Sequence, residues 1–141
     1  MYDVASMKIY VFGNQDYRLD NLAVKISRRL QKEIDGVEFI FVSQNEDVPF
    51  AGQNKIVIMD IVEGLKGPKL ILDSELEKLI LAPRTSVHDW DLGFQIKYLK
   101  KLGKLGKVTV IGLPMKGNLP EVYDSCQSIL RKLVAQDIQG S

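Results

Sequence analysis

Apolar residues recur along the chain with two different periods, and these periods predict strands that alternate with helices. Five short runs of β-branched and aromatic residues are nearly continuous, as is typical of strands buried on both faces of a sheet. These runs cover residues 8–12, 37–42, 55–59, 69–72 and 107–111. Gly13 follows the first run and indicates a turn, and Gly112 follows the last run. The polar stretch 43–54 is expected to be a loop.

Three stretches outside these runs carry apolar residues every three or four positions, which predicts amphipathic helices. The expected inward residues are Leu22, Ile26, Leu30 and Ile34, then Leu92, Ile96 and Leu99, and finally Val122, Cys126, Ile129 and Leu133. The residues expected to face solvent in the second helix are Lys97, Lys100, Lys101 and Lys104. Asp20 or Asn21 is the expected N-cap of the first helix. Residues 138–141 are expected to form a tail. Ser74 and Glu77 form a capping-box pattern, which is typical of the start of a helix. The segment 74–81 is nevertheless too short for the pattern to decide whether it is helical.

Strands that alternate with helices predict an α/β three-layer sandwich, in which a twisted and largely parallel five-stranded sheet carries helices on both faces. The 141 residues fit one domain, spanning 1–141, because no repeat or linker interrupts the pattern. Ligands of open parallel sheets bind beyond the carboxyl ends of the strands, so that edge is where a functional site is expected.

Composition narrows the class of protein. A net charge of +1 argues against binding to nucleic acid or to a membrane surface. No apolar run approaches the ~20 residues that span a bilayer, and the first residues lack the features of a signal peptide, so a cytoplasmic protein is expected. The one cysteine, Cys126, excludes an internal disulfide and a cysteine-cluster zinc site. It lies on an apolar helix face, where we expect it to be buried and inert.

Three potential metal ligands are expected at the carboxyl edge of the sheet. Asp20 follows the first strand, Asp60 ends the third, and His88, the only histidine, begins the helix before the last strand. Two carboxylates and one imidazole suit zinc, nickel, iron or manganese and leave coordination positions open. On spacing alone the simpler interpretation takes precedence, namely a helix cap, a strand-end acid and a surface histidine.

Other motifs are absent or ambiguous. No dinucleotide-binding, Walker or nucleophile-elbow sequence is present. Asp89 and Asp91 could hydrogen-bond the His88 ring, or they could be acids favoured by the first turn of a helix. Trp90 could be a core residue or an anchor for a partner.

One set of these residues resembles the hydrogenase maturation endopeptidases. Gly13-Asn14 is followed by Asp20, a strand then ends in Asp60, and the segment Ser86-Val-His88-Asp-Trp-Asp-Leu-Gly93 is the most specific part. The resemblance spans most of the chain. It implies a phosphorylase/hydrolase-like sandwich, and an enzyme that removes a C-terminal peptide from the nickel-loaded large-subunit precursor of a [NiFe] hydrogenase.

The resemblance also implies roles for the three candidate residues. By position, Asp20, Asp60 and His88 match the family residues that contact the nickel carried by the substrate, and they are thus both the catalytic and the metal-contact residues. The protease itself would hold no tightly bound metal, although a divalent ion could bind weakly in isolation. No serine or cysteine pairs with the histidine in an obvious way, so no covalent nucleophile is assigned.

The sequence departs from the family pattern in two loops. Leu19, Asn21 and Ala23 occupy positions where the family has an acid and glycines, and residues 43–47 replace an Asp-Gly-Gly-Thr loop. These departures leave open a non-catalytic homologue that binds or inspects the metallated subunit. A receiver-like signalling domain, based on Asp60 and Lys116, ranks last because the paired acids that hold magnesium are missing. Asp16 and Glu63 are further acids that could assist Asp20 and Asp60.

Overall fold

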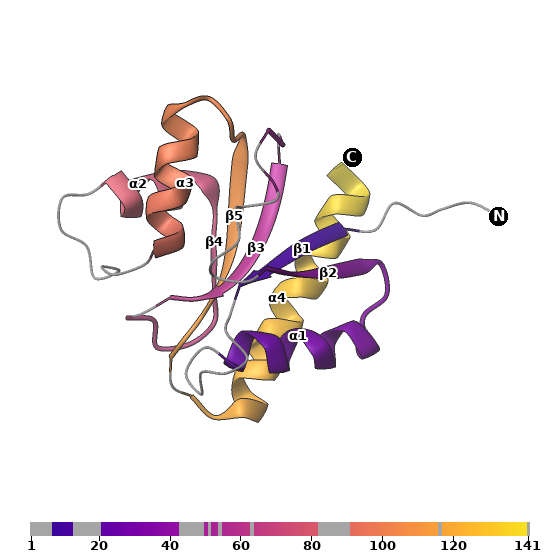
Figure 1. Cartoon of the computed structure of the whole chain (residues 1–141). Helices are drawn as coiled ribbons and strands as arrows, with labels where there is room; N and C mark the ends of the chain where they lie inside the picture. The colour runs from indigo at the N-terminus through magenta and orange to yellow at the C-terminus, as the bar shows by residue number, and fades with distance from the viewer. Residues whose placement is uncertain are drawn as a thin grey trace.

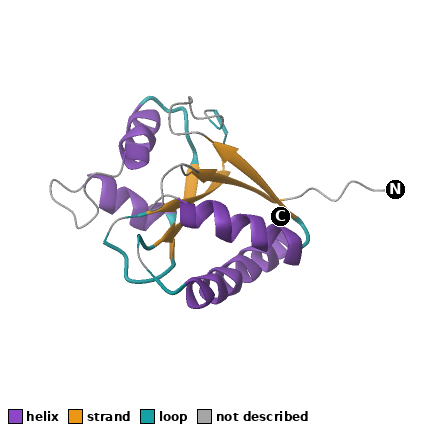
Figure 2. Ribbon diagram, turned by 60° about the horizontal axis from the view of Figure 1, so that its bottom comes forward, coloured by secondary structure: helices purple, strands orange, loops and turns teal. Residues whose placement is uncertain are grey.

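The computed structural model describes residues 7–12, 21–42, 50, 52–53, 55–62, 64–81, 91–115 and 117–140. Its elements are β1 (Met7–Phe12), α1 (Asn21–Glu33), β2 (Val37–Val42), β3 (Lys55–Ile61), β4 (Lys69–Ile71), α2 (Asp73–Leu81), α3 (Asp91–Lys101), β5 (Lys107–Leu113) and α4 (Leu119–Gly140). The strands form one five-stranded sheet, and helices lie on both of its faces (Figures 1 and 2). The predicted α/β sandwich is confirmed.

The sheet has the strand order β2-β1-β3-β5-β4. Pairing is parallel between β1 and β2, between β1 and β3, and between β3 and β5, whereas β4 runs antiparallel to β5. The chain moves outward from β1 to β2 and then returns to place β3 on the other side of β1. The sheet therefore has its topological switch point between β1 and β3.

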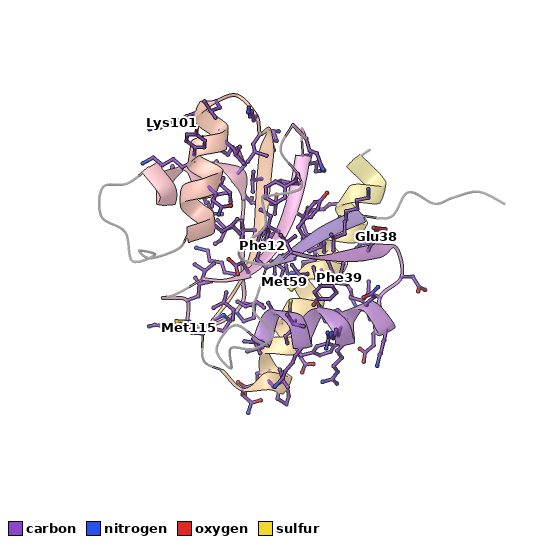
Figure 3. All side chains as sticks on the ribbon, viewed as in Figure 1. Phe12, Glu38, Phe39, Met59, Lys101 and Met115 are labelled. Atoms are coloured by element: carbon purple, nitrogen blue, oxygen red, sulfur yellow. The ribbon has the colours of Figure 1, made fainter. Side chains whose placement is uncertain are left out.

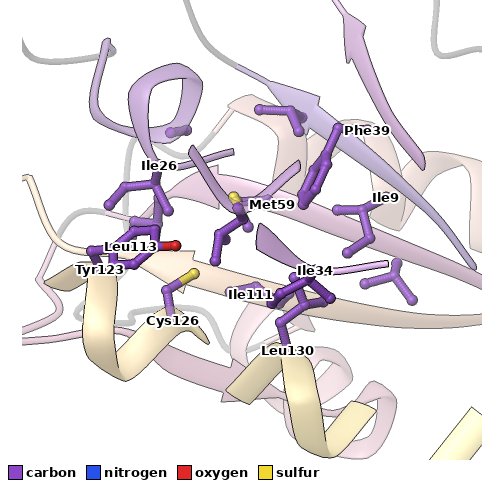
Figure 4. Close-up of a cluster of buried hydrophobic side chains, with 14 of the residues drawn as sticks. Ile9, Ile26, Ile34, Phe39, Met59, Ile111, Leu113, Tyr123, Cys126 and Leu130 are labelled. Atoms are coloured by element: carbon purple, nitrogen blue, oxygen red, sulfur yellow. The ribbon is translucent and has the colours of Figure 1, made fainter. Parts of the chain in front are cut away.

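Side chains alternate between the two faces of the sheet and build a separate core on each. On one face, Ile9, Met59 and Ile111 pack with residues of α1 and α4, including the buried Cys126 (Figure 4). On the other face, Ile58 and Val110 pack with residues of α2 and α3. This two-sided burial explains why the strands read as continuous apolar runs.

Several boundaries differ from those expected. Strand β3 continues through Asp60 and Ile61, because both residues stay paired with β5. Residues 74–81 do form a helix, which begins at Asp73 rather than being capped by Ser74. Helix α4 continues to Gly140, so the tail expected from residue 138 is wrong.

Two side chains were also misplaced by sequence patterning. Phe50, in a stretch expected to be a polar loop, is completely buried and packs edge-on against the rings of Tyr10 and Phe12. Lys100 was expected to face solvent, but its side chain is only 16% exposed and forms ion pairs. Lys101, one residue later, is exposed as expected (Figure 3). Across the part of the chain that is described, no helix is both long and apolar enough to cross a membrane.

Lys100 joins α3 to α2 and to the start of β5. Its Nζ donates to Asp73 Oδ1 at 2.7 Å, to Glu77 Oε1 at 3.4 Å and to the Gly106 carbonyl at 3.1 Å. Asp73 Oδ1 also accepts from the Val108 N–H at 2.8 Å. Burial alone would raise the pKa of Asp73, but the hydrogen bonds from Lys100 and Val108 outweigh it and hold that pKa below 3.8.

We therefore expect Asp73→Ala to lower the free energy of unfolding by about 2 kcal/mol at neutral pH, since a charged hydrogen-bond acceptor is lost from a mostly buried cluster. Because the folded-state pKa of Asp73 is depressed, its contribution is present above 3.8 and is lost as the pH falls through the folded value. Urea unfolding at several pH values measures both effects, and the difference from wild type should shrink in acid.

Glu77→Ala is the matched control for this prediction. Glu77 is half-exposed and lies 3.4 Å from the same ammonium group, so its loss should cost about 0.5 kcal/mol or less. Equal destabilisation by the two substitutions would contradict the central role of Asp73.

Candidate functional site

The carboxyl ends of the parallel strands collect at one edge of the sheet. Strands β1 and β3 end there at Phe12 and Ile61, and β5 ends at Leu113. Since the switch point lies between β1 and β3, this edge is where an open α/β sheet binds its ligands. Phe12 belongs to the core on the α2 and α3 face of the sheet, whereas Met59 belongs to the core on the α1 and α4 face.

Asp60 is the acid that the described structure places at this edge. It is the second-last residue of β3 and is partly exposed. Its Oδ1 accepts a hydrogen bond from the backbone N–H of Ile61 at 2.9 Å, which restrains the carboxylate. Because Val11 pairs with Met59, the end of β1 at Phe12 is level with Asp60. A carboxylate in this position can ligate a metal, accept a proton or orient water.

The strand residue beside Asp60 is a glycine over which the next turn folds. Gly112 of β5 pairs in register with Asp60, and a Cβ atom there would come within 2.7 Å of Leu65 Cδ1 and 3.3 Å of Val62 Cγ2. The Val62 N–H also donates to the Leu113 carbonyl at 2.9 Å. Gly112 therefore lets the turn after Asp60 close down on β5. The sequence pattern ends the last strand at Ile111, but β5 continues through Gly112 to Leu113. A glycine inside a strand often marks such a close approach.

The other two predicted ligands, Asp20 and His88, lie outside the described residues. The same holds for Asp16, Glu63, Asp89, Trp90 and Lys116. The structure thus places Asp60 and leaves the convergence of the three residues as a prediction. Among the residues that are described, no group of three or more acidic, histidine or cysteine side chains could hold a metal ion.

Cys126 is not a candidate nucleophile. It is completely buried in the core between the sheet and α4. Burial raises the pKa of its thiol to about 12, so the reactive thiolate is essentially absent at neutral pH. The expectation that Cys126 is buried is confirmed, and the only cysteine of the sequence is thereby excluded as the attacking group.

Comparison with known proteins gives structural matches only. No family model and no curated protein matches the sequence. The hydrogenase maturating endopeptidase HybD from E. coli superposes with a TM-score of 0.63 at 17% identity, over 95% of this chain and 94% of that one. The fold is that of the hydrogenase maturation endopeptidases.

Two further structures have the same architecture. An endopeptidase from Escherichia coli gives a TM-score of 0.59 at 20% identity, over 92% of this chain and 91% of that one. The [NiFe] hydrogenase maturation protease HycI from Thermococcus kodakarensis gives 0.51 at 17% identity, over 94% and 91% of the two chains. The resemblance drawn from the sequence is thus confirmed at the level of the fold.

The packing over Gly112 yields a test of how the turn after Asp60 is held. Gly112→Ala should lower the free energy of unfolding by about 1 kcal/mol, because the new methyl group must displace the side chains of Leu65 and Val62. Adding Leu65→Ala should remove part of that cost, so the two substitutions will not be additive in urea unfolding.

Gly67→Ala is the control, since it adds a methyl group within the turn that covers Gly112 but meets nothing within 4 Å. We expect it to change stability by no more than about 0.5 kcal/mol. Additive effects of Gly112→Ala and Leu65→Ala would show that Leu65 does not hold the turn against Gly112.

Proposed function

We propose that the chain is an endopeptidase of hydrogenase maturation, which removes the C-terminal peptide of a nickel-loaded [NiFe] hydrogenase large-subunit precursor. The observation that carries the proposal is the position of Asp60 at the carboxyl edge of β3, in a fold shared over nearly its full length with HybD. The nickel belongs to the substrate, and the proposal assigns no resident metal to the protease.

Two helices support a site composed of Asp60, Asp20 and His88. Helix α1 ends beside the amino edge of the sheet, where the Met7 N–H donates to the Gly36 carbonyl at 2.9 Å, so its first residue lies toward the carboxyl edge. Helix α3 likewise ends where Lys100 binds the Gly106 carbonyl, just before β5 begins. Asp20 immediately precedes α1 in the sequence and His88 comes three residues before α3.

In this proposal the three side chains contact the substrate's nickel and bring the scissile peptide bond to it. The metal would polarise the scissile carbonyl or a water molecule, while the carboxylates hold the centre in place and accept a proton. Such a set needs no covalent nucleophile, which agrees with the burial of Cys126.

The alternative is a non-catalytic homologue that binds or inspects the same metallated subunit. The replacement of the Asp-Gly-Gly-Thr loop by residues 43–47 favours it. In either case the proposed partner is the hydrogenase large-subunit precursor, with no nucleic acid and no membrane. We place the protein in the cytoplasm, which its single cysteine supports.

Processing of the precursor tests the proposal directly. We expect the protein to shorten its nickel-loaded precursor, and expect Asp60→Asn or His88→Ala to slow that reaction about 100-fold or more, equivalent to roughly 2.7 kcal/mol of lost transition-state stabilisation. A mobility shift on a denaturing gel, followed by mass spectrometry of the released peptide, gives the rate.

Asp124→Asn is the control, because Asp124 is exposed on α4 and lies outside the proposed site. A complex on size-exclusion chromatography without any cleavage would select the binding alternative. Full cleavage by the His88→Ala variant would remove His88 from the mechanism.

A second prediction concerns metal binding by the isolated protein. Two carboxylates and one imidazole from separate segments make an incomplete shell, so zinc or nickel should bind with a dissociation constant above ~1 µM and be removed by chelators. Asp60→Asn should weaken this binding further in calorimetry. Purification with stoichiometric, chelator-resistant metal would contradict a metal that arrives with the substrate.

A further inference from the structure

The outer side of α3 exposes two large apolar residues. Tyr98 is 64% exposed and Leu102, which directly follows the helix, is 50% exposed, more than any other large apolar side chain in the described part of the chain. The Leu102 N–H donates to the Tyr98 carbonyl at 3.1 Å, so the two side chains stand one helical turn apart on the same side. Leu92 and Ile96 form the opposite side of the helix and are buried in the core over the sheet. Tyrosine is enriched in protein interfaces, so this exposed pair is typical of a docking surface.

Three lysines surround the exposed pair. Lys97 is partly exposed, Lys101 and Lys104 are exposed, and residues 92–104 include no acid. Figure 3 shows Lys101 near the end of α3, on the side away from the sheet. Among the described residues, no ion pair involves these three lysines, whereas Lys100 is bound by acids of α2. Lysines in the last turn also favour the helix dipole, which accounts for the charges but leaves the exposure of the two apolar residues unexplained.

The α3 patch, defined as Lys97, Tyr98, Lys101, Leu102 and Lys104, is held in place by the way the helix ends. Gly103 has a φ of 71° and its N–H donates to the Lys100 carbonyl at 3.0 Å, while the Lys104 N–H donates to the Leu99 carbonyl at 2.9 Å. These two bonds close the helix with a Schellman motif, which needs a left-handed residue such as Gly103. The Lys104 carbonyl also accepts from the Gly52 N–H at 2.6 Å. The backbone under the patch is therefore preorganised, which lowers the entropic cost of binding a partner.

A protein surface with acidic side chains around an apolar centre fits the α3 patch. Its acids would pair with the three lysines, and its apolar side chains would cover Tyr98 and Leu102. A second copy of the chain fits poorly, because a two-fold contact between α3 helices would bring lysines against lysines. The net charge of the whole chain is only +1, so a general attraction to polyanions such as nucleic acid is weak.

The α3 patch lies within reach of the candidate site. Helix α3 begins toward the carboxyl edge, three residues after His88 in the sequence, and runs through Tyr98 to Lys101. At a rise of ~1.5 Å per residue, Tyr98 is about 10 Å along the helix axis from Asp91. A protein–protein interface of standard size covers ~800 Å² on each partner, which extends over such a distance. A protein bound at the carboxyl edge can thus contact the α3 patch as well.

We infer that the α3 patch docks an acidic surface with an apolar centre on the same precursor protein that the candidate site receives. The inference rests on the proposed function, because that function supplies the occupant, the hydrogenase large-subunit precursor. It adds a contact that is remote from the reacting atoms. The α3 patch determines how tightly the precursor is held, whereas Asp60 determines how fast it is processed.

Processing rates at increasing precursor concentration, together with biolayer interferometry of the complex, separate these two roles. Tyr98→Ser and Leu102→Ser should each raise KM about 10-fold and shorten the lifetime of the complex, since interface truncations act mainly on dissociation. Changing Lys97, Lys101 and Lys104 together to glutamate should slow association about 10-fold at low salt, and less as salt is added. In all these variants kcat should change less than about twofold, whereas Asp60→Asn should lower kcat.

Leu119→Ser and Lys132→Glu are the matched controls, because both residues are exposed on α4, which covers the other face of the sheet. Both should bind the precursor as wild type does, and equal losses in these controls would overturn the inference. Unchanged binding in the α3 variants beside a slow Asp60→Asn would also overturn it, and would leave the proposed function standing. A wild-type protein that neither binds nor cuts the precursor would remove both. Binding to phosphatidylserine vesicles that is lost in Tyr98→Ser, with precursor binding unaffected, would assign the patch to a membrane surface instead.

Discussion

The pairing of β3 with β5 is the constraint on which the rest of the molecule depends. Seven residue pairs, from Lys55 with Lys107 to Ile61 with Leu113, fix the centre of the sheet. A shift of this register by one residue would exchange the two apolar faces, because strand side chains alternate. The same register sets Asp60 beside Gly112 at one edge and two lysines side by side at the other. The register of β3 with β5 therefore determines which side chains are neighbours at both edges of the sheet.

The fold was predictable because its determinants are local and repetitive. The strands are continuous apolar runs, and the helices carry apolar residues on one face, so both could be read from short windows of sequence. The positions of residues that depend on contacts with distant parts of the chain could not be predicted in this way. Phe50 is buried because the rings of Tyr10 and Phe12 receive it. Lys100 turns inward because Asp73, at the start of another helix, binds it.

Some features of the candidate site could likewise be predicted from the sequence, and others could not. Asp60 could be assigned to the carboxyl edge because it ends an apolar run, and the structure places it there. The close packing over Gly112 could not be predicted from the sequence. It depends on Leu65, which lies in a turn that is distant from Gly112 along the chain. Whether Asp20 and His88 meet Asp60 depends on two connecting segments outside the described residues. Sequence spacing could propose their convergence but could not establish it.

The opposite charges at the two edges do not conflict, because distance and salt separate them. Lys55 and Asp60 belong to one strand and are five residues apart, which corresponds to roughly 16 Å at a strand rise of ~3.3 Å per residue. That separation is about two Debye lengths at physiological ionic strength, so the lysines barely weaken the attraction of the carboxylate for a cation. The metal contact proposed for Asp60 is thus independent of the lysines at the other edge. A parallel sheet makes this possible, because it gathers all strand starts at one end and all strand ends at the other.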